Sequence, residues 1–256
     1  MIESSQNAKI KEVRHLLTQT KYRKASGCFV IESPKVIQEL LRSEPSRCQY
    51  LLYSDPTMLP KEVDVPSFQV EDALFRQLSS LKTPQGLLAV CQKPSDSFKE
   101  KASSLSRVFI LDGVQDPQNL GAIIRVALAF SFDAVLCLDK SVDFFHPRVC
   151  QASSGGVLNQ CLSVLDDQDL HILKAHGFSF YTLDSEGGQS VTQTDFSNKS
   201  AIILGSEGQG VRASFWGSFE PKSCRIPISD QMESLNVAVA AGIVAQRCQD
   251  MDIKRV

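Results

Sequence analysis

The sequence predicts an α/β fold, with a parallel sheet in the C-terminal half and a small α/β domain before it. Short apolar runs alternate with segments of helical periodicity, and a polar stretch divides the chain. The 256 residues, 43% hydrophobic and 22% charged, are ordinary globular usage and sufficient for two domains. We expect an N-terminal domain at 1–92, a linker at 93–106 and a C-terminal domain at 107–256.

The N-terminal domain alternates helical and strand-like segments. Apolar residues at helical spacing predict a helix over 6–20, followed by a basic turn. In its sequence we find no nucleophile motif, phosphate loop or metal cluster, so we predict a binding domain. The remaining expected elements are a strand at 28–31, a helix at 34–41, a strand at 50–53, a helix at 72–79 and a strand at 86–91.

The segment that follows differs in composition from both domains. It is rich in Lys, Pro, Ser, Asp and Glu and has no hydrophobic periodicity. This composition is typical of an exposed linker.

The C-terminal domain begins with a strand, helix, strand unit. A buried strand at 108–111, an apolar helix at 120–130 and a strand at 134–138 require parallel pairing of the two strands. We therefore expect an open parallel sheet with helices on both faces. The alternation continues with a helix at 166–176, strands at 178–183, 201–204 and 225–228, and a helix at 235–250.

Composition also bounds the setting of the protein. No apolar run reaches the ~20 residues of a membrane span, and the N-terminus lacks a signal-peptide core, so we predict a cytoplasmic protein without a membrane partner. The eight cysteines include no Cys-x-x-Cys pair and are interpreted as reduced thiols. His171 and His176 do not share a helix face. No metal site is predicted.

A net charge of −2 conceals a basic segment near the N-terminus. Such a segment is either a solvated helix face or a contact to nucleic-acid phosphates, and by itself it favours the first. Its members are Lys9, Lys11, Arg14, Lys21, Arg23 and Lys24.

Three separated segments, 116–125, 205–210 and 226–236, each lie where a predicted strand gives way to a loop or helix. Ligands collect at this edge of α/β sheets, so we expect the three to form one site. Asn119 could cap the following helix or present its amide to a ligand. Arg125 lies in a largely apolar helix, where a cation needs an anionic partner.

The glycines of these segments do not match the common nucleotide-binding loops. The turn before Gly121 lacks Gly-x-Gly-x-x-Gly. Gly205 and Gly210 have the spacing of a Walker loop, but Val211 and Arg212 replace the required Lys and Ser or Thr. Both readings are therefore disfavoured.

Three polar residues remain to be placed. Glu207 interrupts the glycine-rich loop, so its carboxylate is expected close to a ligand or to loop backbone. Ser234 is a candidate N-cap of the last helix, with Asn236 in the first turn of that helix. A structural role can explain each of these residues taken alone. It does not explain why the three segments occur together in this order and with this spacing.

The ordered set closely resembles the three motifs of the SpoU (TrmH-type) RNA ribose 2′-O-methyltransferases. The similarity covers residues 107–250, and residues 7–11, 27–32 and 83–86 resemble this family's substrate-binding domain. The motifs are Asp116-Pro117-x-Asn119-x-Gly121-x-x-x-Arg125, Leu204-Gly205-x-Glu207-Gly208-x-Gly210, and Ile226-Pro227-Ile228 continuing to Ser234-Leu235-Asn236-Val237-Ala238-Val239-Ala240.

The resemblance implies a deep trefoil knot, S-adenosyl-L-methionine as cofactor, RNA as substrate and a homodimer. The N-terminal domain would be ribosomal-protein-like, and the basic segment would contact RNA. The implied cofactor residues are Leu204, Gly205, Gly210, Ile226, Ile228 and Leu235. The implied catalytic residues are Asn119, Arg125, Glu207, Ser234 and Asn236.

Two positions depart from the family pattern, because Ser131 and Ser33 stand where glycine is usual. The extra N-terminal domain favours large-subunit ribosomal RNA as the substrate. Alternatives are a transfer-RNA 2′-O-methyltransferase, a knotted RNA-binding protein without activity, and an unrelated nucleotide-binding enzyme that uses the 205–210 loop.

Overall fold

The computed structural model describes residues 1–60, 64–95, 97–184, 187–196, 198–206, 208 and 210–255. Residues 253–255 are described by their backbone alone. The chain forms two compact units. The first contains Met1–Ser95 and Asp143–Leu158, and the second contains Asp96–Val142 and Asn159–Val256. The segment Asp143–Leu158, expected from sequence in the C-terminal domain, thus belongs to the first unit.

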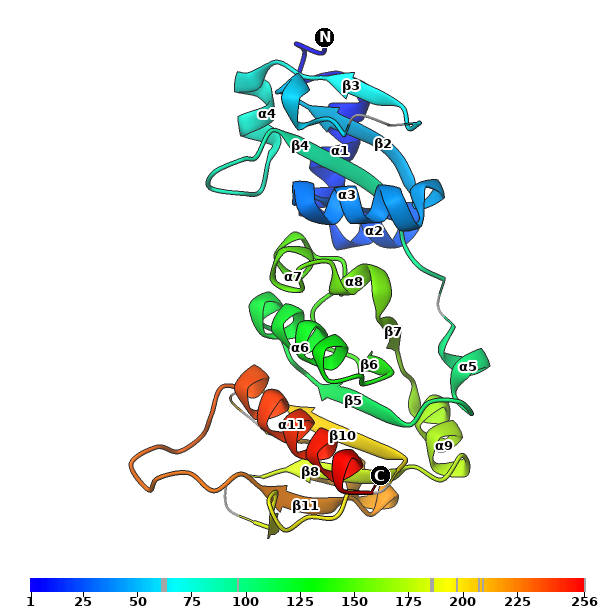
Figure 1. Ribbon diagram of the computed structural model, residues 1–256, viewed down its shortest axis with the longest axis vertical. Coiled ribbons are helices and arrows are strands. Elements are labelled where there is room, and N and C mark those ends of the chain that lie inside the picture. The colour runs from blue at the N-terminus through cyan, green and yellow to red at the C-terminus, as the bar shows by residue number, and fades with distance from the viewer. Residues whose placement is uncertain are drawn as a thin grey trace. The chain divides into compact units, whose positions relative to one another are not determined.

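The first unit is built on a four-stranded sheet in the order β1-β4-β2-β3. Strand β4 is antiparallel to β1 and β2, whereas β3 is parallel to β2 (Figure 1). The sequence pattern missed β3 because it is only three residues long and no residue in it is fully buried. The strands are β1 (Cys28–Ile31), β2 (Cys48–Tyr53), β3 (Ser67–Gln69) and β4 (Leu87–Gln92).

Helices complete the core of this unit. Ile10, Val13 and Leu16 recur at helical spacing on one helix and are fully buried in the same cluster as Val30 and Leu52 of the sheet. The predicted basic turn after this helix is instead a second helix. The helices are α1 (Ala8–Thr18), α2 (Thr20–Ser26), α3 (Pro34–Ser43), η1 (Pro45–Arg47), η2 (Pro56–Met58), α4 (Asp72–Leu78), α7 (Pro147–Ala152) and α8 (Gly156–Asn159).

The predicted linker is partly folded. Helix α5 (Phe98–Lys101) lies within it, and Phe98, Ala102 and Leu105 are buried in the core of the second unit. The expectation of a fully exposed linker is therefore wrong. The three apolar residues stand at helical spacing, i, i+4 and i+7, but the pattern is short and lies among charged residues and serines, so it was missed in the sequence.

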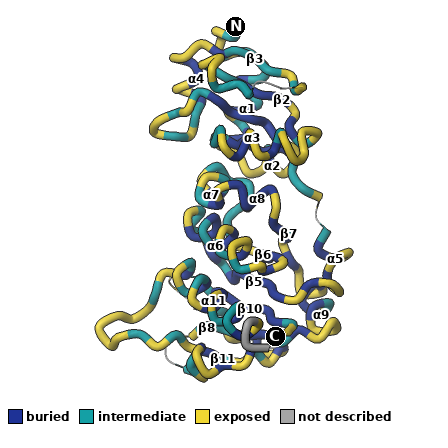
Figure 2. The backbone as a smooth tube through the Cα atoms, viewed as in Figure 1, coloured by how far each residue is buried: buried dark blue, intermediate teal, exposed yellow. Residues whose placement is uncertain are grey.

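The second unit contains a seven-stranded sheet in the order β7-β6-β5-β10-β8-β11-β9, and every pairing is parallel. The central strands β5 and β10 are almost completely buried (Figure 2). The strands are β5 (Arg107–Asp112), β6 (Ala134–Cys137), β7 (Cys161–Val164), β8 (Ser179–Leu183), β9 (Gln189–Ser190), β10 (Ser200–Gly205) and β11 (Lys222–Arg225).

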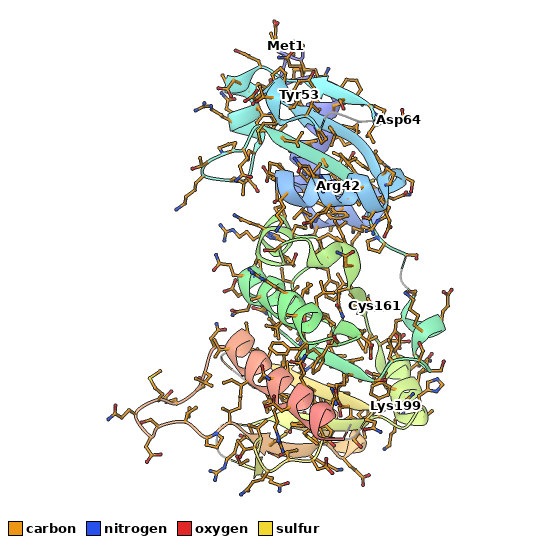
Figure 3. All side chains as sticks on the ribbon, in the orientation of Figure 1. Met1, Arg42, Tyr53, Asp64, Cys161 and Lys199 are labelled. Carbon is orange, nitrogen blue, oxygen red and sulfur yellow. The ribbon has the colours of Figure 1, made fainter. Side chains whose placement is uncertain are left out.

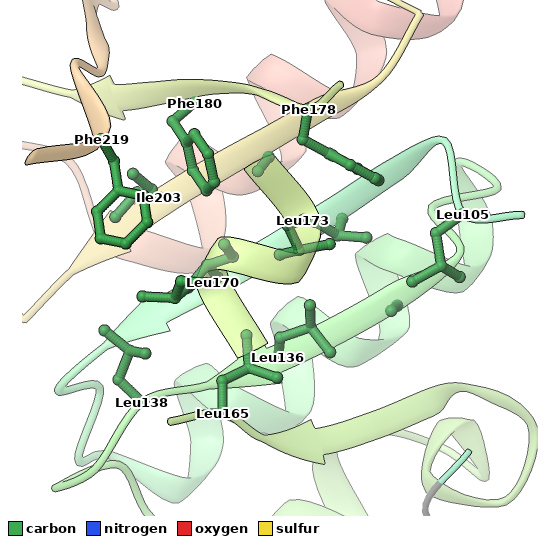
Figure 4. Close-up of a cluster of buried hydrophobic side chains, with 14 of the residues drawn as sticks. Leu105, Leu136, Leu138, Leu165, Leu170, Leu173, Phe178, Phe180, Ile203 and Phe219 are labelled. Carbon is green, nitrogen blue, oxygen red and sulfur yellow. The ribbon is translucent and has the colours of Figure 1, made fainter. Parts of the chain in front are cut away.

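Helices cover both faces of this sheet. On one face, Leu170 and Leu173 of α9 pack with strand residues such as Leu136 and Ile203 in one hydrophobic cluster (Figure 4). Alternate strand residues point to the opposite face, where α6 and α11 pack against each other. The helices are α6 (Pro117–Ala129), α9 (Asp167–Ala175), α10 (Ala213–Trp216), η3 (Gly217–Phe219) and α11 (Val237–Arg255).

Between β11 and α11 the chain makes a long excursion away from the sheet (Figure 1). Its side chains from residue 229 to 234 are exposed (Figure 3). The excursion brings the third predicted motif back to the sheet at the start of α11. Among the helices as described, none has the length and apolar character needed to cross a membrane.

Candidate active site

A cavity of about 930 Å³ lies at the carboxyl edge of the seven-stranded sheet. The ends of β8 and β10 and the chain after β11 form its walls, together with the start of α11. This is the position at which parallel sheets bind ligands. Its lining includes Thr182, Leu183, Asp184, Leu204, Gly205, Gly210, Trp216, Ile226, Ile228, Ser234, Leu235 and Asn236.

All six residues that the sequence resemblance assigns to a cofactor line this one cavity. The second and third motifs, separated by residues 211–225, therefore meet in the folded chain. Leu204, Ile226, Ile228 and Leu235 give the cavity an apolar surface. Such a surface suits the flat base and the hydrocarbon portions of a nucleoside cofactor.

The glycine-rich segment closes back on itself at the mouth of β10. The Ser206 amide donates to the Gly210 carbonyl at 3.1 Å, and the Gly210 amide donates to the Ser206 carbonyl at 2.9 Å. A Cβ atom at Gly205 would lie 2.1 Å from the carbonyl carbon of Gly210, so only glycine fits there. The predicted catalytic residue Glu207 lies outside the described residues.

The first motif reaches the cavity through one side chain. Asn119 lies in the first turn of α6 and is buried. Its Oδ1 accepts a hydrogen bond of 2.9 Å from Nδ2 of Asn236, a cavity residue. Asp116 caps α6 by accepting from the Gln118 amide, so the capping role considered for Asn119 is wrong.

The last helix begins two residues later than predicted. Asn236, and not Ser234, is its N-cap, because the Asn236 Oδ1 accepts from the amides of Ala238 and Val239 at 2.9 and 3.3 Å. One carboxamide thus fixes the helix start with its oxygen and holds Asn119 with its nitrogen. Ser234 is exposed at the cavity lining.

Arg125 lies two turns along α6 from the helix start. From the sequence a cation in this apolar helix was expected to need an anionic partner, but the side chain of Arg125 is exposed, where water solvates it. Within the described parts of the chain it has no ion pair or side-chain hydrogen bond. It does not line the cavity.

The two serines at expected glycine positions differ in conformation. Ser131 has a φ of 56°, in the left-handed region that favours glycine, directly after α6. Ser33 has a φ of −93°, which any residue adopts. Of the two serines that replace glycine, only Ser131 is therefore in a strained backbone conformation.

One predicted RNA contact is buried. Arg23 is 1% exposed, and its Nε donates to the Asp143 carboxylate at 2.7 Å. Its other nitrogens donate to the Leu16 carbonyl and the Thr20 hydroxyl. Burial, reinforced by the positive charge of Arg23, lowers the pKa of the neighbouring His146. The prediction that Arg23 contacts RNA is wrong, because all three nitrogens of its guanidinium donate hydrogen bonds to groups within the first unit.

The other members of the basic segment remain at the surface. The Lys9 ammonium lies 4.2 Å from the ring centroids of both Tyr50 and Phe68, a cation–π arrangement. Four of these side chains are exposed and form two helical pairs, each with a spacing of three residues. They are Lys11 and Arg14 on α1 and Lys21 and Lys24 on α2.

Sequence reasoning missed part of the cavity. Thr182 and Asp184 lie at the end of the predicted strand β8, and that position alone was a signal for them. Trp216 was missed because its helix α10 spans only four residues. Among the described residues, no group of three or more His, Cys, Asp or Glu side chains is arranged to hold a metal ion.

Comparison with known proteins matches both halves of the chain. Residues 106–246 match the SpoU rRNA Methylase family, and residues 7–89 match the MRM3-like substrate binding domain. A Bacillus subtilis protein, the 23S rRNA (guanosine(2553)-2′-O)-methyltransferase RlmP, is 32% identical over 95% of this chain and 96% of its own length.

Solved structures show the same fold. The SpoU methyltransferase AviRb from Streptomyces viridochromogenes, in complex with AdoMet, has a TM-score of 0.86 at 21% identity, covering 97% of this chain and 99% of that one. A putative RNA methyltransferase of the TrmH family from Porphyromonas gingivalis has a TM-score of 0.79 at 29% identity, covering 95% and 98%.

Proposed function

Because this chain belongs to the SpoU rRNA methylase family, we propose that it transfers a methyl group from S-adenosylmethionine to a ribose 2′-hydroxyl of large-subunit ribosomal RNA. One observation carries the proposal: the six residues assigned to the methyl donor by sequence resemblance line a single cavity at the carboxyl edge of the sheet. The similarity to a 23S rRNA 2′-O-methyltransferase over nearly the full length supports the choice of RNA.

The cavity fits the donor in size and chemistry. Its volume, about 930 Å³, lies within the range of pockets for small organic ligands. Leu204, Ile226 and Leu235 offer apolar surface, and Gly205 and Gly210 line the cavity beside them. When bound, S-adenosylmethionine supplies a sulfonium methyl group that needs little activation, so positioning of the ribose is the main task of the protein.

The amide pair Asn119 and Asn236 supplies part of this positioning. Asn236 lines the cavity, and its hydrogen bond to the buried Asn119 fixes the orientation of both amides. Ser234, exposed at the same lining, presents a hydroxyl that can donate to or accept from the ribose.

Arg125 is assigned to the RNA. Its exposed guanidinium has the planar donors that match a phosphate, and a guanidinium is a poor base because it keeps its proton at neutral pH. We therefore give it phosphate positioning as its main role.

The fold is proposed to contain the deep trefoil knot of the family. Its support is the sheet order, in which β10 is inserted between β5 and β8, followed by the return of α11 to pack on α6. Such threading is a rare exception among folds.

The protein is proposed to act as a homodimer through α6 and α11. Three large apolar residues are exposed on these packed helices, and such patches mark interfaces: Leu128 (39%), Val239 (52%) and Ile243 (37%). Gel filtration with light scattering should give a dimer that Val239→Glu dissociates. Val164→Glu, at an exposed apolar residue of β7, is the matched control and should leave the dimer intact.

The deciding experiment measures methyl incorporation from labelled S-adenosylmethionine into unmodified ribosomal and transfer RNA. Label in large-subunit RNA as alkali-resistant ribose methylation, lost with Arg125→Ala, is the expected result. Label confined to transfer RNA would show that transfer RNA, and not ribosomal RNA, is the substrate. Cofactor binding without label in free RNA or in ribosomal assembly intermediates would indicate a binding protein and overturn the proposal.

A further inference from the structure

Asp112 stands where the glycine-rich segment leaves the sheet. It is the last residue of β5, and its Cα partner on β10 is Gly205, the first residue of that segment. Its side chain is completely buried. A carboxylate taken out of water at this place needs several hydrogen-bond donors to remain stable.

The donors come from the chain directly after this segment. The backbone amide of Arg212 donates to Asp112 Oδ2 at 2.9 Å, and the Arg212 Nε donates to Oδ1 at 2.5 Å. The indole Nε1 of Trp216 donates to Oδ2 at 2.9 Å. The chain therefore leaves the sheet at Gly205, beside Asp112. It returns to Asp112 at Arg212 and Trp216, which donate hydrogen bonds to the carboxylate.

The residues held in this way form a wall of the cavity. Val211, Ala213 and Trp216 all line it. Trp216 is 1% exposed and packs against Phe180 and Phe219, with ring centroids 6.0 and 5.7 Å away. The aromatic contacts support the ring, but the bond to Asp112 fixes the orientation of its polar edge.

We infer that Asp112 is a positioning residue that sets the affinity of the cavity for the methyl donor by closing the glycine-rich segment and holding Trp216. This inference rests on the proposed function, since it takes S-adenosylmethionine as the ligand. Asp112 does not line the cavity, so it acts through Arg212 and Trp216.

Arg212 provides an internal control. Its NH2 group also contacts Asp139 at 3.2 Å, but Asp139 is 70% exposed. An exposed ion pair contributes little, whereas the bonds to the buried Asp112 are charge-assisted and shielded from water. Asp112→Asn and Asp139→Asn therefore each remove one negative charge that contacts Arg212. The first charge is buried and the second is exposed.

The test compares these two variants in the full-length protein. Binding of S-adenosylmethionine is measured by calorimetry and by the fluorescence of Trp216, the only tryptophan in the chain. Asp112→Asn should raise the dissociation constant and the KM for S-adenosylmethionine about 10-fold or more. The KM for RNA and kcat at saturating donor should change less than about twofold, as should all constants of Asp139→Asn.

Each failure has a distinct signature. A wild-type protein that does not bind S-adenosylmethionine would refute the proposed function, whatever the variants do. Normal donor affinity in Asp112→Asn would refute the role of Asp112, and so would an equal rise in the KM for RNA. If Asp112→Asn does not fold, Trp216→Phe removes the donated N–H and keeps an aromatic wall. Unchanged donor affinity by calorimetry in that variant would equally refute the inference.

Discussion

Arg23 and Arg125 have exchanged the environments that their local sequence suggests. Arg23 belongs to a basic run and is buried against Asp143, whereas Arg125 interrupts an apolar helix and is exposed. The difference arises from the face of the helix on which each arginine lies. Local charge density therefore does not predict which cation is structural and which is available to a ligand.

Removing the buried cation should have the largest effect on stability. Arg23→Ala leaves the Asp143 carboxylate, 10% exposed, without its partner, and should lower the free energy of unfolding by about 3–5 kcal/mol. Urea denaturation measures this. Lys24→Ala, an exposed neighbour, should change it by less than about 0.5 kcal/mol. Equal stability of the two variants would break the contrast between the arginines.

Removing the exposed cation should act on catalysis instead. Arg125→Ala should lower methyl transfer by about 100- to 1000-fold, as loss of a group that positions charge does, while the urea midpoint stays unchanged. Arg125→Lys retains the charge without the planar donors and should recover only part of the rate. Turnover close to wild type in Arg125→Ala would remove this residue from the active site.

The exposed part of the basic run should contribute to RNA affinity. Replacing Lys11, Arg14, Lys21 and Lys24 by Gln should weaken binding about 10-fold and reduce the slope of log K against log salt by up to about 3. Fluorescence anisotropy with a ribosomal RNA fragment measures both. Binding of S-adenosylmethionine serves as the control and should not change. An unaltered salt slope would identify these side chains as an ordinary solvated face.

The smallest effect is expected just after the helix that carries Arg125. The Phe132 amide donates to the Ala127 carbonyl and the Ser131 amide to the Leu128 carbonyl, a Schellman motif that places Ser131 in the left-handed conformation. Ser131→Gly should raise the thermal midpoint, with a gain of about 1 kcal/mol. Ser33→Gly, at an ordinary φ, should give no gain. Destabilisation by Ser131→Gly would mean that its side chain has a role beyond backbone geometry.

The sequence by itself determined the parallel α/β class of the second unit and the cavity residues of the second and third motifs, but it gave no sign of the short strands β7 and β9 or of Trp216 in the cavity. Buried parallel strands are continuous apolar runs, and the residues after them meet at one edge, so the strands and the common edge of the three motifs follow from local pattern. The assignment of Leu204, Ile226 and Leu235 to the cofactor came from the family resemblance. The start of α11 was displaced by two residues, because both Ser234 and Asn236 are suitable caps and only the fold selects Asn236.

Only the tertiary structure decided which distant groups meet. Arg23 and Asp143 are 120 residues apart, Asn119 and Asn236 are 117 apart, and Asp112 and Arg212 are 100 apart. No local periodicity encodes such pairs, because a buried charge or amide takes whichever partner the sheet order brings within hydrogen-bond distance. The insertion of β10 between β5 and β8 brings the glycine-rich segment to Asp112, and this arrangement is set by packing of the whole unit and not by any single stretch of sequence.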